Sequence, residues 1–352
     1  MLIENVFKCL RQYTQLAVNS YKAEKYVSNM LFNRATFKLP LVTGHAIHMR
    51  NYTSQGNTRL KDVLKFWTKK FSDEGVSEPQ ESVNLIVAHA MNKKMIHEVN
   101  THERASEDIV QAINKMCELR LKRTPVQYVI KEWDFIDMTL EMCPPVLIPR
   151  PETEELASMV VNSLQSSNVK NGLFLEIGCG TGAVSLYILK CLPKMRCVAV
   201  DISSVACDLT LRNASFYDLQ DRLTVIHGDA FTDATLSQLQ HYGRYNIIVS
   251  NPPYITSTDM LLLQPEVKLY EDHRALYGGE DGLDIARNIL QLSRKLLHCN
   301  GSVWLEVGLN QADKIKSMVN QNPDLHLVYK QTIQDFSKRD RFCKLSYQPE
   351  NS

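Results

Sequence analysis

Hydrophobic residues recur at helical spacing through residues 59–130. In a first stretch, ended by Gly75, they stand three or four positions apart at Leu60, Val63, Leu64, Trp67 and Phe71. A second helix is predicted from Pro79, and a third after Ser106, with one apolar stripe made of Ile109, Ile113, Met116 and Leu119. We expect a small helical domain over 59–130. It carries no catalytic pattern, so recognition of a partner is its predicted role.

The pattern changes at residue 131. Residues 131–141 alternate apolar and polar side chains around Trp133, Phe135 and Ile136, which predicts a short β-hairpin. Four prolines then follow within residues 144–151 and make a rigid extended segment, so we assign 131–150 as a hairpin and proline-rich linker.

Beyond the linker, short apolar runs alternate with helical segments. Strands are predicted at 173–177, 196–200, 223–226, 245–249, 302–307, 326–329 and 342–345, and helices at 151–164, 183–192, 281–297 and 311–319. Strands that alternate with helices indicate an α/β fold with a mostly parallel sheet. The last two strands lack an intervening helix and should form an antiparallel pair. We therefore expect a Rossmann-like, seven-stranded domain over 151–352.

Charge separates the first 58 residues from the rest of the chain. The whole sequence has a net charge of +1, but residues 1–58 hold seven Lys or Arg against two Glu, which leaves the remainder at −4. A basic, acid-poor leader is typical of a mitochondrial transit peptide, and residues 50–54 resemble a matrix-protease cleavage site. We predict a mitochondrial matrix protein. A disordered basic arm is the alternative for residues 1–58.

The composition argues against several classes of protein. No apolar run reaches the roughly 18 residues of a membrane span. The nine cysteines contain no C-x-x-C pair and are odd in number, so neither a disulfide framework nor a zinc site is supported. We expect no metal, no membrane association and a monomer.

Glycines follow the first predicted strand of the α/β domain. Glu176 lies near the end of that strand, and Gly178, Gly180 and Gly182 lead into a helix, an arrangement that brings backbone close to a nucleotide-like ligand. Asp201 ends the second strand, where an acid suits ribose hydroxyls, and Asp229 follows the third, near an adenine edge. The loop lacks the pyrophosphate-type G-x-G-x-x-G spacing. It therefore favours S-adenosyl-L-methionine as cofactor over a dinucleotide.

The fourth strand ends in Asn251, Pro252, Pro253 and Tyr254. Prolines donate no backbone hydrogen bond, so their carbonyls are free to accept, and an aromatic ring can cover a planar group. These residues suit an amide or amino group held for attack on an electrophile. A plain strand-to-loop turn is the alternative. Arg150, fixed between two prolines, is either a substrate contact or a surface ion-pair partner.

Taken together, the motifs resemble the HemK/PrmC family of protein-(glutamine-N5) methyltransferases. The resemblance spans about residues 60–346, and its blocks are Thr124–Tyr128, Ile148–Glu154, Glu176–Gly182, Asn251–Ile255 and Leu276–Gly282. It departs from the common family pattern at Cys179, His273, Tyr277 and Glu280.

The resemblance implies a class I methyltransferase domain behind a helical domain that grips a peptide-chain release factor. The methylated group would be the glutamine of the factor's Gly-Gly-Gln tip, in support of translation termination. Asn251, Pro252 and Tyr254 would be catalytic, and Pro253 and Arg150 would join them in substrate binding. The cofactor would be held by Glu176, Gly178, Gly180, Gly182, Asp201, Asp229 and Asn251.

Two rival functions remain open on the sequence. An amino-methyltransferase acting on adenine or guanine in DNA or RNA would use the same Asn-Pro-Pro-Tyr motif on a flipped base. The acidic body behind the leader argues against nucleic acid as substrate. A non-catalytic binding module is disfavoured because the glycine loop, Asp201 and Asn-Pro-Pro-Tyr are all intact.

Overall fold

The computed structural model describes residues 58–167 and 171–349. The predicted leader, apart from Thr58, lies outside the described residues. Within them, no helix combines the length and the apolar character needed to cross a bilayer.

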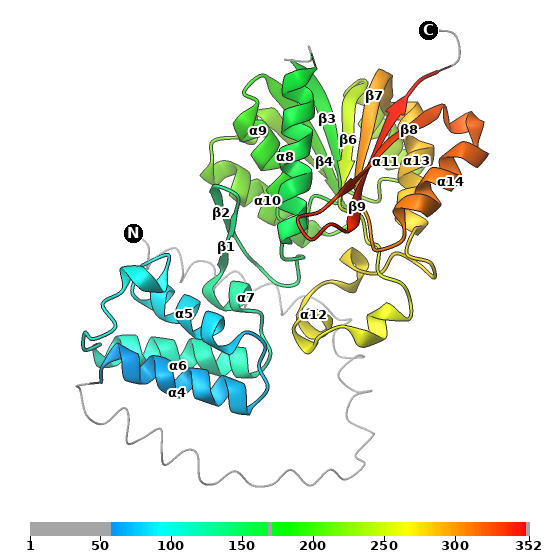
Figure 1. Cartoon of the computed structure of the whole chain (residues 1–352). Coiled ribbons are helices and arrows are strands. Elements are labelled where there is room, and N and C mark those ends of the chain that lie inside the picture. The colour runs from blue at the N-terminus through cyan, green and yellow to red at the C-terminus, as the bar shows by residue number, and fades with distance from the viewer. Residues whose placement is uncertain (1–57, 168–170, 350–352) are drawn as a thin grey trace, which may run out of the picture. The chain divides into compact units, whose positions relative to one another are not determined.

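Residues 60–130 form the three predicted helices and a short fourth helix, α7, that was not predicted (Figure 1). These are α4 (Leu60–Asp73), α5 (Pro79–Ala90), α6 (Glu107–Leu121) and the short α7 (Val126–Ile130). Gly75 follows α4 with a φ of +63°, and the Ser106 hydroxyl caps α6 by accepting from the Ile109 amide at 3.4 Å. The core of this region is apolar and includes Trp67 and Phe71, both fully buried.

The predicted stripe on α6 is wrong by about one position around the helix. Its buried residues are Val110, Ile113, Cys117 and Arg120, whereas Leu119 is 43% exposed. The error has a physical cause. Arg120 is buried because it has an ion-pair partner far away in the sequence, and an apolar count along the helix cannot include it.

The predicted hairpin is confirmed as β1 (Glu132–Phe135) and β2 (Met138–Glu141). Phe135, Met138 and Leu140 are buried in the same apolar cluster as one face of the main sheet. The Tyr217 hydroxyl bonds both the Thr139 amide and its carbonyl, at 2.6 and 2.9 Å. The hairpin is therefore packed onto the α/β domain.

A seven-stranded sheet forms the centre of the α/β domain, as predicted. In the order β5-β4-β3-β6-β7-β9-β8, five strands run parallel and β9 is antiparallel to both β7 and β8. The strands are β3 (Gly172–Ile177), β4 (Met195–Asp201), β5 (Leu223–His227), β6 (Tyr245–Ser250), β7 (Leu297–Glu306), β8 (Leu327–Gln334) and β9 (Asp340–Tyr347). The helices are α8 (Pro151–Ser166), α9 (Ala183–Cys191), α10 (Ser204–Phe216), α11 (Asp233–His241), α12 (Pro265–Tyr270), α13 (Asp284–Leu296) and α14 (Ala312–Gln321).

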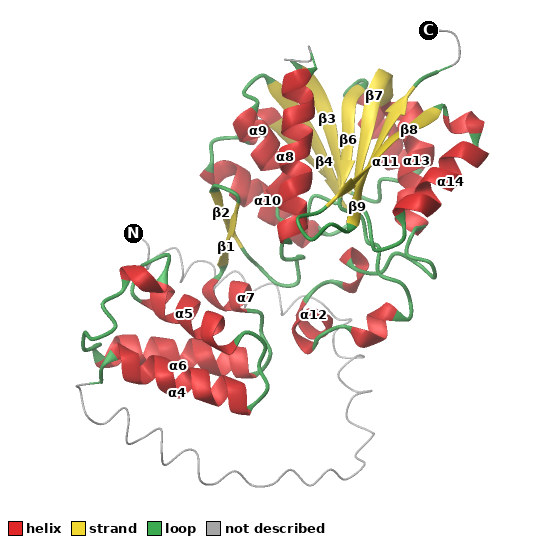
Figure 2. Ribbon diagram, in the orientation of Figure 1, coloured by secondary structure: helices red, strands yellow, loops and turns green. Residues whose placement is uncertain are grey.

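Helices cover both faces of this sheet (Figure 2). Alternate strand residues belong to different clusters: Phe174 and Ile247 pack with α8 and α9, whereas Leu175 and Ile248 pack with α13 and α14. This two-residue period explains the continuous apolar runs in the sequence, since a strand buried on both faces needs no polar side.

The carboxyl group of Glu176 is buried inside this domain. Glu176, on β3, is 3% exposed and accepts hydrogen bonds from the amide and the hydroxyl of Ser185 on α9. Burial raises its pKa to about 8, because no cation offsets the loss of hydration. The side chain is therefore largely uncharged at neutral pH.

The helical region is joined to α12 by a buried ion pair. Arg120, whose side chain is 4% exposed, donates to Glu266 at 2.9 Å and also to Ser77 and Ser82. The Tyr270 hydroxyl, at the end of α12, donates to the Lys122 carbonyl at 2.8 Å. The segment around α12 is thus fixed to α6 by polar contacts.

Glu176→Gln should change how stability depends on pH. Between about pH 4.5 and 8 the folded protein keeps a proton on Glu176 that the unfolded chain has lost. The free energy of unfolding of the wild type therefore falls as pH rises, by up to ~1.4 kcal/mol per pH unit from this group. Because Gln is neutral and isosteric with Glu, the free energy of unfolding of the variant does not fall in this way as pH rises.

Urea unfolding of both proteins at pH 5, 6.5 and 8 measures the effect. The difference in unfolding free energy should shift in favour of the variant as pH rises, while all other titrating groups cancel. A difference that stays constant with pH would contradict a neutral Glu176.

Arg120→Ala should destabilise the protein by about 3 kcal/mol, because it leaves the Glu266 carboxylate buried without its main partner. Lys69→Ala is the matched control. It removes an exposed ion pair to Asp73 of similar length, 2.7 Å, and should cost no more than ~0.5 kcal/mol. Equal losses in chemical denaturation would show that the Arg120 pair acts as an ordinary surface contact.

Candidate active site

The candidate site is built at the edge of the sheet where the parallel strands end. The central strands β3 and β6 are neighbours, with Glu176 opposite Val249. The Ser250 hydroxyl donates to the Ile177 carbonyl at 2.6 Å and joins the ends of the two strands. The glycine loop after β3 and the Asn-Pro-Pro-Tyr segment after β6 therefore start side by side.

The glycine loop lies between a strand, β3, and a helix, α9, as predicted. Gly178, Gly180 and Gly182 have φ values of +80°, +54° and +81°, a region where side chains are rarely tolerated. Space around Gly178 is open, whereas a Cβ on Gly182 would come within 3.0 Å of Thr210. The loop leads directly into α9, so backbone amides at a helix N-terminus face this edge.

Asp201, the last residue of β4, contacts the glycine loop. Its carboxylate accepts from the Gly180 amide at 2.9 Å and from the Ser203 amide at 2.9 Å. The side chain is half-buried, and burial raises its pKa although both amides oppose the shift. Each oxygen keeps a further lone pair, so the carboxylate can still accept from hydroxyl groups of a ligand.

Asp229 and Glu176 have different surroundings. Asp229 follows β5, is half-buried and accepts from the Phe231 amide at 3.0 Å. Gly228 donates to the Asp201 carbonyl, which brings the loops after β4 and β5 together. Glu176, expected at the cofactor, instead bonds Ser185 on α9, and its contact with a cofactor stays a prediction.

The Asn-Pro-Pro-Tyr segment presents two free acceptors. In the described part of the chain, the Pro252 carbonyl accepts no hydrogen bond, and the Asn251 side chain uses its amide nitrogen alone, donating to Thr153 at 3.0 Å. Pro252 is buried and Asn251 half-buried. An amide N–H group brought to this place would find acceptors with unused lone pairs.

A second loop packs against the backbone of this segment. Ile255 forms a short parallel bridge with Tyr277, in which its amide donates to the Leu276 carbonyl and its carbonyl accepts from the Gly278 amide, both at 2.9 Å. A Cβ at Gly278 would lie 2.5 Å from the Pro253 carbonyl oxygen, so no larger residue fits there. The Gly278-Gly279 loop thus fixes the path of the motif.

Tyr254 is held by Arg341 on β9. The guanidinium donates to the phenol oxygen at 2.5 Å and lies 4.7 Å from the ring centre, so one ring face is already covered. Burial and the carboxylate of Glu306 raise the pKa of Tyr254 to about 12. The phenol therefore stays protonated at neutral pH and cannot serve as a base.

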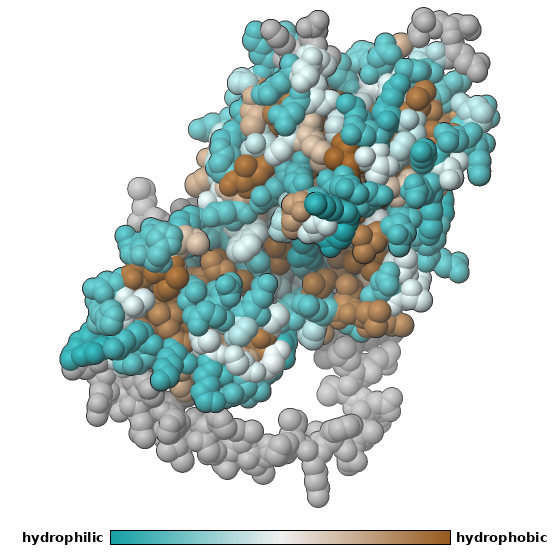
Figure 3. Space-filling model, viewed as in Figure 1, coloured by the Kyte–Doolittle hydropathy of each residue, from teal (hydrophilic) through white to brown (hydrophobic). Residues whose placement is uncertain are grey.

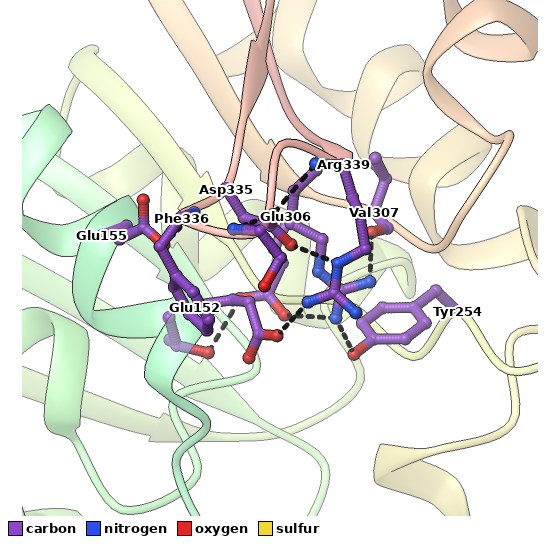
Figure 4. A network of polar contacts seen from close by, with 11 residues as sticks. Glu152, Glu155, Tyr254, Glu306, Val307, Asp335, Phe336 and Arg339 are labelled. Atoms are coloured by element: carbon purple, nitrogen blue, oxygen red, sulfur yellow. Dashed lines mark hydrogen bonds and ion pairs between the residues drawn. The ribbon is translucent and has the colours of Figure 1, made fainter.

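A buried network continues behind Tyr254 (Figure 4). Arg341 donates to Glu306 at 3.2 Å, and Thr153 donates to the other oxygen of Glu306 at 2.8 Å. Burial raises the pKa of Glu306, against the charge of Arg341. The sequence assigned none of these three residues a role. Thr153 belongs to the Ile148–Glu154 block and Glu306 lies in the strand predicted at 302–307, but nothing in the sequence marked Arg341.

Arg150 forms an ion pair with a buried carboxylate. It donates to both oxygens of Glu271 at 2.8 and 2.6 Å, and the Glu271 side chain is 1% exposed. The structure thus shows the ion-pair role that the sequence left open. Contact between Arg150 and a substrate stays a prediction, and its side chain is 31% exposed.

No group of three or more His, Cys, Asp or Glu side chains in residues 58–167 and 171–349 is placed to hold a metal ion.

Comparisons with known proteins match most of the chain. The family model described as PrmC N-terminal domain matches residues 62–130, and the one described as Methyltransferase small domain matches 153–264. A solved structure titled as a release factor-specific protein-(glutamine-N5) methyltransferase from Alicyclobacillus acidocaldarius shares 24% identity. It covers 60% of this chain and 100% of its own, with a TM-score of 0.37.

Two relatives are similar over nearly their whole lengths. The human MTRF1L release factor glutamine methyltransferase is 40% identical over 293 residues, 81% of this chain and 86% of its own. The release factor glutamine methyltransferase of Clostridium acetobutylicum is 28% identical over 80% of this chain and 96% of its own. At this identity and coverage, the chain belongs to the family of release factor glutamine methyltransferases.

Proposed function

We propose that this protein methylates the side-chain nitrogen of the glutamine in the Gly-Gly-Gln tip of a peptide-chain release factor, using S-adenosylmethionine. The observation that carries the proposal is the pair of free acceptors, Asn251 Oδ1 and the Pro252 carbonyl, next to the glycine loop. Membership of the family supports the substrate class.

The residues present fit the cofactor. The left-handed glycines keep backbone close to the ligand, and Asp201 stands at the strand end where ribose hydroxyls would be bound. Asp229 would lie near the adenine. When bound, S-adenosylmethionine supplies an electrophilic methyl group.

An amide nitrogen is a weak nucleophile because its lone pair is delocalised into the carbonyl. Asn251 and Pro252 would accept both N–H bonds of the glutamine and place negative dipoles where positive charge develops on nitrogen. Tyr254 would cover the amide with the ring face that Arg341 leaves uncovered. Because the Tyr254 phenol is protonated, the proton would be lost to water or a carbonyl after transfer.

The helices of residues 60–130 are the proposed contact region for the body of the release factor. Their match to the PrmC N-terminal domain model supports this assignment. We also infer that the protein works in the mitochondrial matrix, which the basic, acid-poor composition of residues 1–58 supports.

Methyl transfer from labelled S-adenosylmethionine tests the function directly. The full chain should label a purified mitochondrial release factor and leave unlabelled a copy whose tip Gln is changed to Ala. Label on a duplex or a structured RNA, with none on the release factor, would move the substrate to nucleic acid and overturn the proposal.

Asn251→Ala should lower kcat by roughly 100- to 1,000-fold, because it removes an acceptor that acts on the charge developing at nitrogen. The affinity for S-adenosylmethionine, measured by calorimetry, should change little. Asn322→Ala provides a matched control. Asn322 is exposed, and its side chain bonds only the Met318 carbonyl among the described residues, so turnover should be retained. Wild-type turnover by Asn251→Ala would remove Asn251 from the mechanism.

A further inference from the structure

A chain of four buried or half-buried polar residues reaches from β9 to the proposed substrate acceptor. Its contacts are Arg341 to Glu306 at 3.2 Å, Thr153 to Glu306 at 2.8 Å, and Asn251 to Thr153 at 3.0 Å. Glu306 is fully buried and Thr153 is 5% exposed, so water competes little for these bonds. The four residues come from β9, β7, α8 and the loop after β6.

The direction of every hydrogen bond between these four residues follows from the chemistry of the first, Arg341. A guanidinium can only donate, so the Glu306 carboxylate accepts from Arg341. The Thr153 hydroxyl gives its single proton to the second oxygen of Glu306, the carboxylate that pairs with Arg341. Thr153 is left with lone pairs and no proton.

Asn251 must then turn its NH2 group towards Thr153, because two acceptors cannot bond each other. Its carbonyl oxygen points away from Thr153 and has no hydrogen-bond partner in the described part of the chain. The opposite rotamer of the amide would present the NH2 group to the substrate, and a donor cannot bind the N–H of glutamine.

We propose that Thr153 and Glu306 are positioning residues that fix which end of the Asn251 amide faces the substrate. This inference rests on the proposed function, since it assigns the oxygen of Asn251 to the glutamine amide. Thr153 lies in the first turn of α8, and the rigid prolines before it fix where this helix begins.

Glu306→Gln tests the direction of these hydrogen bonds with almost no change in side-chain volume. Arg341 would hold the carbonyl end of the new amide, so its NH2 end would donate to Thr153. The Thr153 hydroxyl would then donate to Asn251 and favour the opposite rotamer. We expect kcat to fall roughly 10- to 100-fold, with the affinity for S-adenosylmethionine unchanged.

The variants Thr153→Val and Thr153→Ser together provide a second test. Val keeps the shape of Thr but has no hydroxyl, so kcat should fall by a similar factor, with little change in KM for the cofactor. Ser keeps the hydroxyl and should recover most of the loss. The double variant Thr153→Val with Glu306→Gln should be no slower than the worse single variant, because both act through Asn251.

Glu152→Gln is the matched control. Glu152 neighbours Thr153 in sequence and accepts a hydrogen bond from Arg339 at 2.7 Å (Figure 4). This bond does not belong to the contacts that reach Asn251. This variant should turn over like the wild type. Thermal unfolding of each protein separates a loss of fold from a loss of positioning.

The outcomes distinguish this inference from the proposed function. Absence of label on the release factor with the wild-type protein would overturn the function itself, whereas wild-type turnover by Asn251→Ala would remove Asn251, and with it the positioning role, from the mechanism. A slow Asn251→Ala beside wild-type rates for Thr153→Val and Glu306→Gln would overturn the positioning role alone. Equal losses for Thr153→Val and Thr153→Ser would also overturn it, since they would point to packing rather than to the hydroxyl.

Discussion

Parallel pairing of β3 with β6 is the contact on which the candidate site depends. The register places Phe174 opposite Ile247 and Glu176 opposite Val249, and the bond from Ser250 to Ile177 closes the pair at its carboxyl end. A slip of one residue would exchange the two faces of β6 and turn Asn251 away from the glycine loop. The apolar cores on both sides of the sheet oppose such a slip, so packing far from the site sets its geometry.

Three buried carboxyl groups show how differently one side-chain chemistry is accommodated. Glu176 has no cation and largely keeps its proton, Glu306 faces the guanidinium of Arg341, and Glu266 faces that of Arg120. Burial would raise the pKa of Glu266, yet hydrogen bonding and charge from Arg120 bring it below the usual range. At Glu266 the hydrogen bonding and charge of the partner outweigh burial, whereas at Glu306 burial outweighs the charge of Arg341 and the pKa is raised.

Much of the architecture could be predicted because it rests on local patterns. The period of apolar residues predicted the hairpin, all seven strands and seven of the helices, but not α7, α10, α11 or α12. The order of motifs along the chain indicated the sheet edge that holds these motifs. The glycines of the loop after β3, Gly178, Gly180 and Gly182, were located for the same reason, and their contact with a cofactor stays a prediction. Their left-handed φ values require glycine, and that requirement is visible in the sequence.

Contacts between distant segments could not be predicted in this way. Arg120 with Glu266 and Arg341 with Tyr254 join residues 146 and 87 positions apart. No spacing rule connects such pairs, and a buried arginine interrupts an apolar stripe instead of completing it. Glu176 shows the converse. Its position at a strand end predicts a ligand contact, which stays a prediction, whereas its hydrogen bonds to Ser185 on the neighbouring helix could not be predicted.

The segment after Tyr254 has hydrophobic surface of its own. Leu261, Leu262 and Leu269 are 73%, 81% and 67% exposed, and hydrophobic residues gather over this part of the face in Figure 3.

Helix α12, in the same segment, is joined to α6 by Arg120 and Tyr270, while Arg150 binds Glu271 just beyond α12. The helical region and the catalytic domain therefore cannot be exchanged independently between family members without breaking these contacts. An exchange of residues 60–130 alone would separate Arg120 from the Glu266 that matches it, so functional hybrids would have to inherit both segments from one parent.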